Sequence, residues 1–282
     1  MSRFDVRAYT RDPLDLREAP GPDPVGLAPE ALDAVAYLWS VERTALDRVR
    51  DVLVTPTTHA DARVTAFLIT WTFEQHALAE RLAGVLAANG RPAVPPADTW
   101  RGRAARAWDE RAAPTVGAVR SNLLGADVTT AHMAAGWLDA ATTGLLHRRL
   151  PVLAPALGEL SRPAEALKAR HLQFFAAELA WRLSVPPVPE RRGRVNRAGT
   201  VSGARRQGRG AAAAWRWPGT RHAHPRVAGD VARHLLDRDG ADVRALDATF
   251  AAFPGLGGSR PLARALSRVL GASRRATGAG GA

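Results

Sequence analysis

The stretch FLITWTFEQHALAERLAGVLAANG, residues 67–90, decides the fold class. Its large apolar residues recur every three or four positions, which is the period of an α-helix with one buried face. Asn-Gly-Arg-Pro at 89–92 places a glycine and then a proline where a helix commonly ends. The pattern predicts a helix over about 60–88. Its buried face would carry Val64, Phe67, Leu68, Trp71, Leu78, Leu82, Val85 and Leu86.

Three further segments show the same helical period. They are residues 29–53, a segment that starts at Val116 or Val128 and ends near Leu150, and residues 163–183. A Pro-, Arg- and Trp-rich connection, residues 91–112, separates the second helix from the third. Simple up-and-down bundles use short loops, so a long crossover indicates another connectivity. We therefore predict an all-α fold in which residues 29–185 form a four-helix bundle with a long crossover.

The composition of the remaining chain predicts four flanking segments. Residues 1–28 are rich in Pro and Asp and are expected to form an extended arm. Residues 186–224 are rich in Arg, Gly and Ala, which favours a disordered linker. Residues 225–270 recover helical patterning and are expected to form a small helical appendage, and residues 271–282 a flexible tail. The helical patterning of the appendage lies in 227–236, 243–253 and 261–270.

The net charge of +12 belongs mainly to the linker. Residues 186–224 hold nine arginines and one glutamate, a net charge of +8. Such a segment can bind phosphate backbones by releasing counterions. Arginine is also over-used in GC-rich coding sequence, so a solvated linker is the simpler interpretation, with nucleic acid or an acidic partner as the alternative.

The absence of cysteine excludes disulfides, zinc–thiolate sites, iron–sulfur clusters and cysteine nucleophiles. The N-terminus is charged and lacks the apolar region of a signal peptide. The longest apolar stretches, such as residues 64–71, are too short to cross a bilayer. We expect a cytoplasmic protein without membrane contact, and the alanine- and arginine-rich composition favours a bacterial source.

Several polar residues fall on the apolar stripes of the predicted helices. Glu42 and Gln75 interrupt the stripes of the first and second helices. In the fourth helix, Lys168, His171 and Glu178 share one face at positions i, i+3 and i+10. A buried charge without a partner costs several kcal/mol, so inward-facing members of this set must meet partners.

Three stretches carry a resemblance to a known family: residues 67–90 quoted above, GWLDAATTGLLHRRL at 136–150, and EALKARHLQFFAAEL at 165–179. Residues 30–183 resemble the ferritin-like superfamily of diiron-carboxylate four-helix bundles, more closely its bacterial oxygenase-like and desaturase-like branch. In that family the corresponding helices carry a Trp before Glu-Glu-x-x-His, a Glu just before Thr-Thr, and Asp-Glu-Ala-Arg-His-x-x-Phe-Phe. The resemblance implies the same bundle here.

The resemblance also implies where the metal ligands of the family would fall. The six positions are Glu42, Gln75, Leu78, Ala140, Lys168 and His171. Glu42 and His171 alone keep a ligand of the family type, so the resemblance implies a degenerate metal site. Our hypothesis is a metal-free core in which Lys168 pairs with Glu42, while Gln75 and His171 complete the hydrogen bonds.

Three functions stay open. The first is a non-catalytic scaffold or partner-binding protein without a cofactor. We favour this function over an enzyme. The second is a diiron-type or single-metal oxidoreductase that holds iron or manganese at Glu42 and His171 and recruits Glu74 or Glu178. The third is a binder of nucleic acid or acidic partners through residues 186–224. A protein partner and a homo-oligomer are left open.

Simpler interpretations apply to the polar residues near Gln75 and Leu78 and to the histidines of the third helix. Glu74, His76 and Glu80 are expected on a partly solvated flank of their helix. His132 and His147 lie about four turns apart on the third helix, so they cannot share one ion.

Overall fold

The computed structural model describes residues 4–18, 23–53, 56–94, 127–184, 241–254 and 256–257. Within these ranges every regular element is helical and none is a strand, which confirms the all-α prediction for this part of the chain. The predicted linker 186–224 and the tail lie outside the described residues. So do the crossover beyond residue 94 and the appendage segments 227–236 and 261–270.

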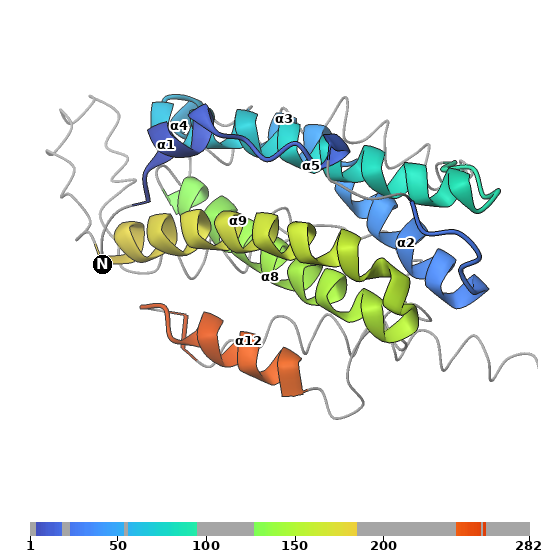
Figure 1. Cartoon of the computed structure of the whole chain (residues 1–282). Helices are drawn as coiled ribbons and strands as arrows, with labels where there is room; N and C mark the ends of the chain where they lie inside the picture. Colours follow the sequence, from blue (N-terminus) through green and yellow to red (C-terminus); the bar gives the residue numbers. More distant parts are fainter. Residues whose placement is uncertain are drawn as a thin grey trace, which may run out of the picture.

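Three helices of 27 residues each dominate the structure: α5 (Ala62–Ala88), α8 (Asp127–Leu153) and α9 (Gly158–Ser184). The shorter α2 (Pro29–Glu42) packs mainly against α5, whereas α8 packs mainly against α9 (Figure 1). A 3₁₀ turn, η2 (Pro155–Leu157), joins α8 to α9, so the two helices are close neighbours in sequence and space. The helix ends lie within a few residues of the predicted ones, except that α9 starts five residues before position 163.

The predicted first helix is interrupted. Its residues form α2 and a separate helix, α3 (Ala45–Leu53). At Thr44 the backbone N–H (3.3 Å) and the hydroxyl (2.7 Å) both donate to the carbonyl of Val41, three residues earlier. This tighter bonding takes the place of the α-helical pattern and ends α2. The prediction of one continuous helix over 29–53 was therefore wrong.

The N-terminal segment is not the extended arm that its composition predicted. It contains α1 (Val6–Arg11) and a 3₁₀ turn, η1 (Leu16–Glu18). Asp5 caps α1, because its carboxylate accepts the Ala8 N–H at 3.0 Å. Val6 and Tyr9 are buried, and both α1 and η1 pack against α5. Val6 and Tyr9 are three residues apart, a spacing that places both on one face of a helix. This spacing indicates α1, although the composition of the segment does not.

Two further short helices complete the described structure. α4 (Pro56–His59) occupies the predicted break before α5, and Asp61 then caps α5 by accepting the N–H groups of Arg63 and Val64. α12 (Ala241–Ala251) matches the predicted appendage segment 243–253. It lies along α8, where the Phe250 and Trp137 rings are 5.5 Å apart (Figure 1).

The core consists of two apolar clusters with a polar layer between them. In α5 the first cluster takes residues 78–86 and the second takes 64–71, so the buried polar residues 74–75 separate them. In α9, Lys168 and His171 separate the same two clusters. The polar layer therefore crosses the middle of the helix packing, where buried charges must find partners inside the protein.

No helix among the described residues combines the length and the hydropathy that a bilayer crossing needs. This agrees with the prediction from the apolar stretches of the sequence, for the part of the chain that is described.

Candidate functional site

The polar layer is the candidate functional site, because its ionisable side chains are almost entirely removed from water. Each of its six members is at most 1% exposed. They come from α2, α5, α8 and α9, and we call them the buried ion network: Glu42, Glu74, Gln75, His147, Lys168 and His171.

Lys168 is at the centre of the first half of this network. Its Nζ donates to Glu42 Oε2 at 2.6 Å and also to Gln75 Oε1. The other carboxylate oxygen of Glu42, Oε1, lies 3.1 Å from His147 Nε2. The ion pair between Glu42 and Lys168 that the sequence predicted is therefore confirmed, with Gln75 as the expected second acceptor.

His147 is the member of this half that the sequence analysis missed. From the sequence, the only statement about His147 is that it cannot share an ion with His132. His147 follows Ala140, the position of a family carboxylate, by seven residues. Seven residues are two helical turns, so both side chains lie on the same face of α8. This spacing could have indicated that His147 faces the same site as position 140.

Glu74 is at the centre of the second half. Its Oε2 accepts hydrogen bonds from the Tyr9 hydroxyl and, at 2.8 Å, from His171 Nε2. Its Oε1 accepts the Leu14 N–H at 2.9 Å and lies 3.5 Å from the Arg170 guanidinium. The carboxylate is thus enclosed by α5, α9 and the N-terminal segment.

Two predictions were wrong at this point. Glu74 was expected on a partly solvated flank, but it is fully buried. His171 was expected to complete the hydrogen bonds of the Glu42–Lys168 pair, but it bonds to Glu74 instead. The physical reason is the N-terminal segment, which covers this flank of α5 and turns a solvated position into an enclosed one.

Burial and charge together set the protonation of the network. Burial raises the pKa of Glu42, but Lys168 and His147 outweigh it, so this pKa lies below the usual 4.5. Burial likewise raises the pKa of Glu74, and its bond to His171 leads the effects that bring the pKa below 4.5. Burial lowers the pKa of both His147 and His171, despite their carboxylate neighbours. The glutamates are therefore ionised and the histidines neutral at neutral pH.

These pKa shifts predict a loss of stability in acid. The pKa values of His147 and His171 lie below the ordinary 6.5 in the folded protein, so the unfolded chain takes up protons first as the pH falls below 6.5. Stability is thus complete above this pH and is lost below it, by up to about 1.4 kcal/mol per pH unit for each histidine. The lowered pKa values of Glu42 and Glu74 add a second loss below 4.5.

Urea unfolding at a series of pH values from about 7 to about 4 measures this loss. We expect the free energy of unfolding to fall continuously over the range. A flat profile across it would contradict the assignment of neutral histidines and ionised glutamates.

Tyr9→Phe should lower the free energy of unfolding by roughly 1–3 kcal/mol, because Glu74 stays buried and loses a hydrogen-bond donor. The aromatic stacking on Phe67, with ring centroids 4.9 Å apart, is kept by the new side chain. Thermal or urea unfolding gives the value. Thr10→Ala is the matched control: its hydroxyl bonds at 3.2 Å to Arg7 within the same segment, so a change within about 0.5 kcal/mol is expected.

The remaining predicted site residues lie apart from the network. Glu178 is buried and lies 3.2 Å from Arg63 and 3.2 Å from Arg182, so its charge is already compensated. His76 and Glu80 are exposed, as predicted, and His76 Nε2 lies 3.5 Å from Glu80 Oε1. Leu78 and Ala140 belong to the apolar clusters.

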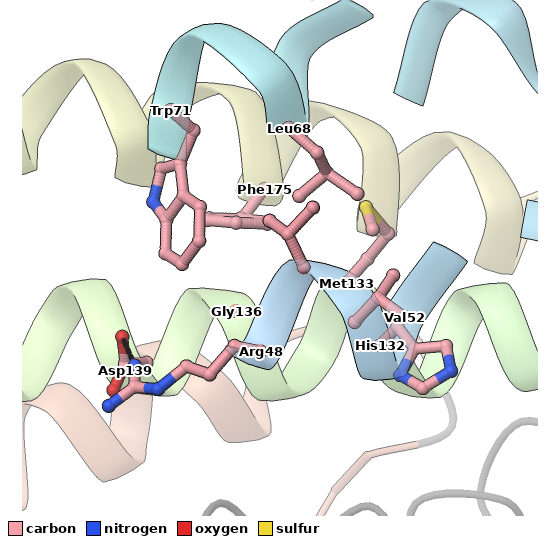
Figure 2. A pocket seen from close by; sticks show the side chains of 10 residues that line it. Arg48, Val52, Leu68, Trp71, His132, Met133, Gly136, Asp139 and Phe175 are labelled. Atoms are coloured by element: carbon pink, nitrogen blue, oxygen red, sulfur yellow. Dashed lines mark hydrogen bonds and ion pairs between the residues drawn. The ribbon is translucent and has the colours of Figure 1, made fainter. Parts of the chain in front are cut away.

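A small cavity lies among α3, α5, α8 and α9. Its water-accessible volume is about 20 Å³, and its walls are mainly apolar, with Trp71 and Phe175 on one side (Figure 2). In the same view, Arg48 reaches Asp139 in an ion pair that connects α3 to α8. Such a volume holds about one water molecule. The cavity is therefore too small for an organic substrate.

The network does not fit the diiron site of the family that the sequence resembles. Leu78 and Ala140 offer no donor atom, and the Lys168 ammonium lies within hydrogen-bond distance of two of the other positions. Both oxygens of Glu42 are engaged. In the described part of the chain, no group of three or more His, Asp or Glu side chains is arranged to hold a metal ion.

Comparisons with protein-family models, curated proteins and solved structures find no match to this chain. The function must therefore be inferred from the residues and their arrangement.

Proposed function

We propose that this chain is a ferritin-like helical bundle in which a metal-free ion network has replaced the diiron site. We further propose that it acts as a non-catalytic scaffold or partner-binding protein in the bacterial cytoplasm. The observation that supports this is the Lys168 ammonium, which bonds to Glu42 and Gln75. All three are positions at which the family carries ligands, so the ammonium supplies the positive charge that a metal would otherwise supply.

The arrangement also suggests what the network does for the fold. Glu42, Gln75, His147 and Lys168 come from four different helices, and each bonds to at least one of the others. A buried ion pair adds little net stability compared with apolar packing, but it penalises any packing that leaves a charge alone. The network would thus select one register of the four helices, as suits a scaffold with a rigid surface.

Elemental analysis tests the proposal. The protein is expressed with iron and manganese supplied and is purified without chelators. We expect no stoichiometric iron or manganese in a protein that is folded and helical. Stoichiometric metal that disappears in Glu42→Ala or His171→Ala, and persists in the control His76→Ala at an exposed position, would overturn the proposal.

One observation favours the oxidoreductase as the second candidate. The Nδ1 atoms of His147 and His171 are buried and have no hydrogen-bond partner among the described residues. A neutral imidazole whose Nε2–H donates to a carboxylate keeps a lone pair on Nδ1, which is a metal-ligand atom. Iron or manganese bound through Glu42 and His171, with Glu74 or Glu178 recruited, is the arrangement that elemental analysis would then reveal.

The third candidate, binding of nucleic acid or acidic partners, depends on the charge of residues 186–224. Binding to duplex DNA that weakens steeply with salt, and vanishes when these residues are deleted, would support it.

A further inference from the structure

Lys168, Gln75 and Glu42 bring an amine, a carboxamide and a carboxylate into mutual contact. Lys168 Nζ bonds to the carbonyl oxygen of Gln75 and lies 2.6 Å from Glu42 Oε2. The three side chains are each 1% exposed and come from α9, α5 and α2. No water-filled path is needed for them to react with one another, because nucleophile, electrophile and proton acceptor are already together.

We propose that Lys168 and Gln75 form an intramolecular isopeptide bond that joins α9 to α5, with Glu42 as the proton acceptor. The proposal rests on the buried ion network of the proposed function, which is the state before the bond forms; in the joined protein an amide and a neutral Glu42 replace the ion pair. It does not depend on a scaffold role. It adds a covalent modification site to what has so far been a non-covalent contact.

The chemistry balances without any further reactant. A bond forms between Lys168 Nζ and the side-chain carbonyl carbon, Cδ, of Gln75, and the bond from Cδ to the amide nitrogen of Gln75 breaks. Of the two protons that the ammonium loses, one passes to Glu42 and the other to the leaving nitrogen. Ammonia departs, and Glu42 is left as a neutral carboxylic acid beside His147.

Three features of the site favour this reaction. The first is proximity: Nζ already contacts the Gln75 carbonyl oxygen, and groups that reach a near-attack geometry within one molecule react with effective concentrations of about 10⁵–10⁸ M. The second is the loss of a buried charge pair, because burial penalises an ammonium and a carboxylate but not the amide and the acid that replace them. The third is the exclusion of water, which would otherwise compete for the carbonyl carbon.

The surroundings also hold the lysine in place. A Cβ added at Gly144 of α8 would lie only 3.2 Å from Lys168 Cβ, so α8 passes directly against the lysine stem. Attack requires the amide plane of Gln75 to turn so that its carbon faces Nζ. The terminal torsion of glutamine is broad, so this rotation costs little.

Gln75 rather than Glu42 is the expected acceptor of the lysine. The pKa of Glu42 is lowered below its usual value, so this side chain is a carboxylate at neutral pH. A carboxylate is a poor electrophile, whereas a neutral amide carbon can be attacked; Glu42 takes up its proton only as the ammonium that lowers its pKa is consumed. The leaving group identifies the acceptor: ammonia from Gln75, or water from Glu42.

The test is the intact mass of the purified full-length protein under denaturing conditions. We expect a mass lower than that of the sequence by one ammonia molecule, after allowing for removal of the first methionine. Tryptic digestion should then yield the 64–81 peptide joined to a peptide that is uncleaved after Lys168. The full sequence mass, with free 64–81 peptide, would overturn the proposal, and so would a loss of water that maps to Glu42.

Variants test the role of each residue in the proposed bond. Gln75→Met removes the amide and should restore the unmodified mass. Glu42→Met removes the proton acceptor without adding a second carboxamide, and should also abolish the ammonia loss. Gln173→Met on α9, outside the network, is the matched control and should keep it. A variant that fails to fold leaves the wild-type mass and peptide map as the deciding measurement.

The same samples separate this proposal from the proposed function. Full sequence mass without metal would overturn the isopeptide bond and leave the scaffold standing. A cross-linked protein with stoichiometric iron or manganese would keep the bond and overturn the metal-free scaffold.

Discussion

Replacing Lys168 by methionine should lower the free energy of unfolding by roughly 3–5 kcal/mol, because the change leaves an uncompensated charge on Glu42. Glu42 is 1% exposed, so water cannot take the place of the ammonium. His147 remains at 3.1 Å from the carboxylate, but burial lowers its pKa, so at neutral pH it offers a hydrogen bond rather than a charge. Urea unfolding of the two proteins at one pH measures the difference.

The double variant Lys168→Met with Glu42→Gln separates the charge from the packing. Removing both charges leaves no unpaired ion at positions 42 and 168, so we expect the double variant to recover part of the loss. Arg162→Ala is the matched control on the surface. Its pair with Glu159 is 74% exposed on both sides, and such pairs contribute about 0.2–1 kcal/mol. A loss at Lys168 no larger than this control would contradict the enclosed network.

Gly136→Val should destabilise the protein by about 3 kcal/mol, the upper part of the usual range for overpacking a core. A Cβ at Gly136 would lie 2.3 Å from Cε1 of Phe175, the closest approach of α8 to α9 at a glycine. Figure 2 shows Gly136 directly beneath the Phe175 side chain, on the wall of the small cavity. The ring cannot retreat freely, because its centroid is 5.3 Å from Phe67 and 5.7 Å from Phe174.

Gly158→Ala is the control for this glycine. It also lies in a helix, but a Cβ there would meet nothing within 4 Å. Stability should therefore change by no more than about 1 kcal/mol, and in the stabilising direction. Melting temperatures of the two variants give the comparison. Equal effects at both glycines would mean that α8 and α9 are not in close contact at Gly136.

The periodicity of the sequence predicted where the long helices lie. It did not predict the break in the first helix or the N-terminal helix that packs against α5. The stripe through residues 67–90 located α5 to within two residues, because a buried helix face repeats locally every three to four positions. The sequence did not show the break at Thr44, since a threonine is compatible with both a helix and a helix end. The N-terminal helix was missed because proline and aspartate dominate the segment that contains it.

Some contacts of the candidate site were predicted correctly from the sequence and others were not. Glu42 and Lys168 were paired correctly because each interrupts an apolar stripe, and a buried charge must meet its opposite. Glu74 and His171 were assigned wrongly because their partner Tyr9 is 65 residues away from Glu74 in the chain. The Tyr9 hydroxyl carries no charge that would require a buried partner, so nothing in the sequence indicated this contact.

The sequence by itself therefore determined the main helical segments, the inward-facing positions of Glu42, Gln75 and Lys168, and the need for a cation opposite Glu42. Only the tertiary structure decided that Tyr9 and Leu14 enclose Glu74, that His147 bonds to Glu42, and that His171 bonds to Glu74. The physical reason is that the period of a helix specifies which face is buried, whereas the element that covers that face is selected by the packing of the whole chain.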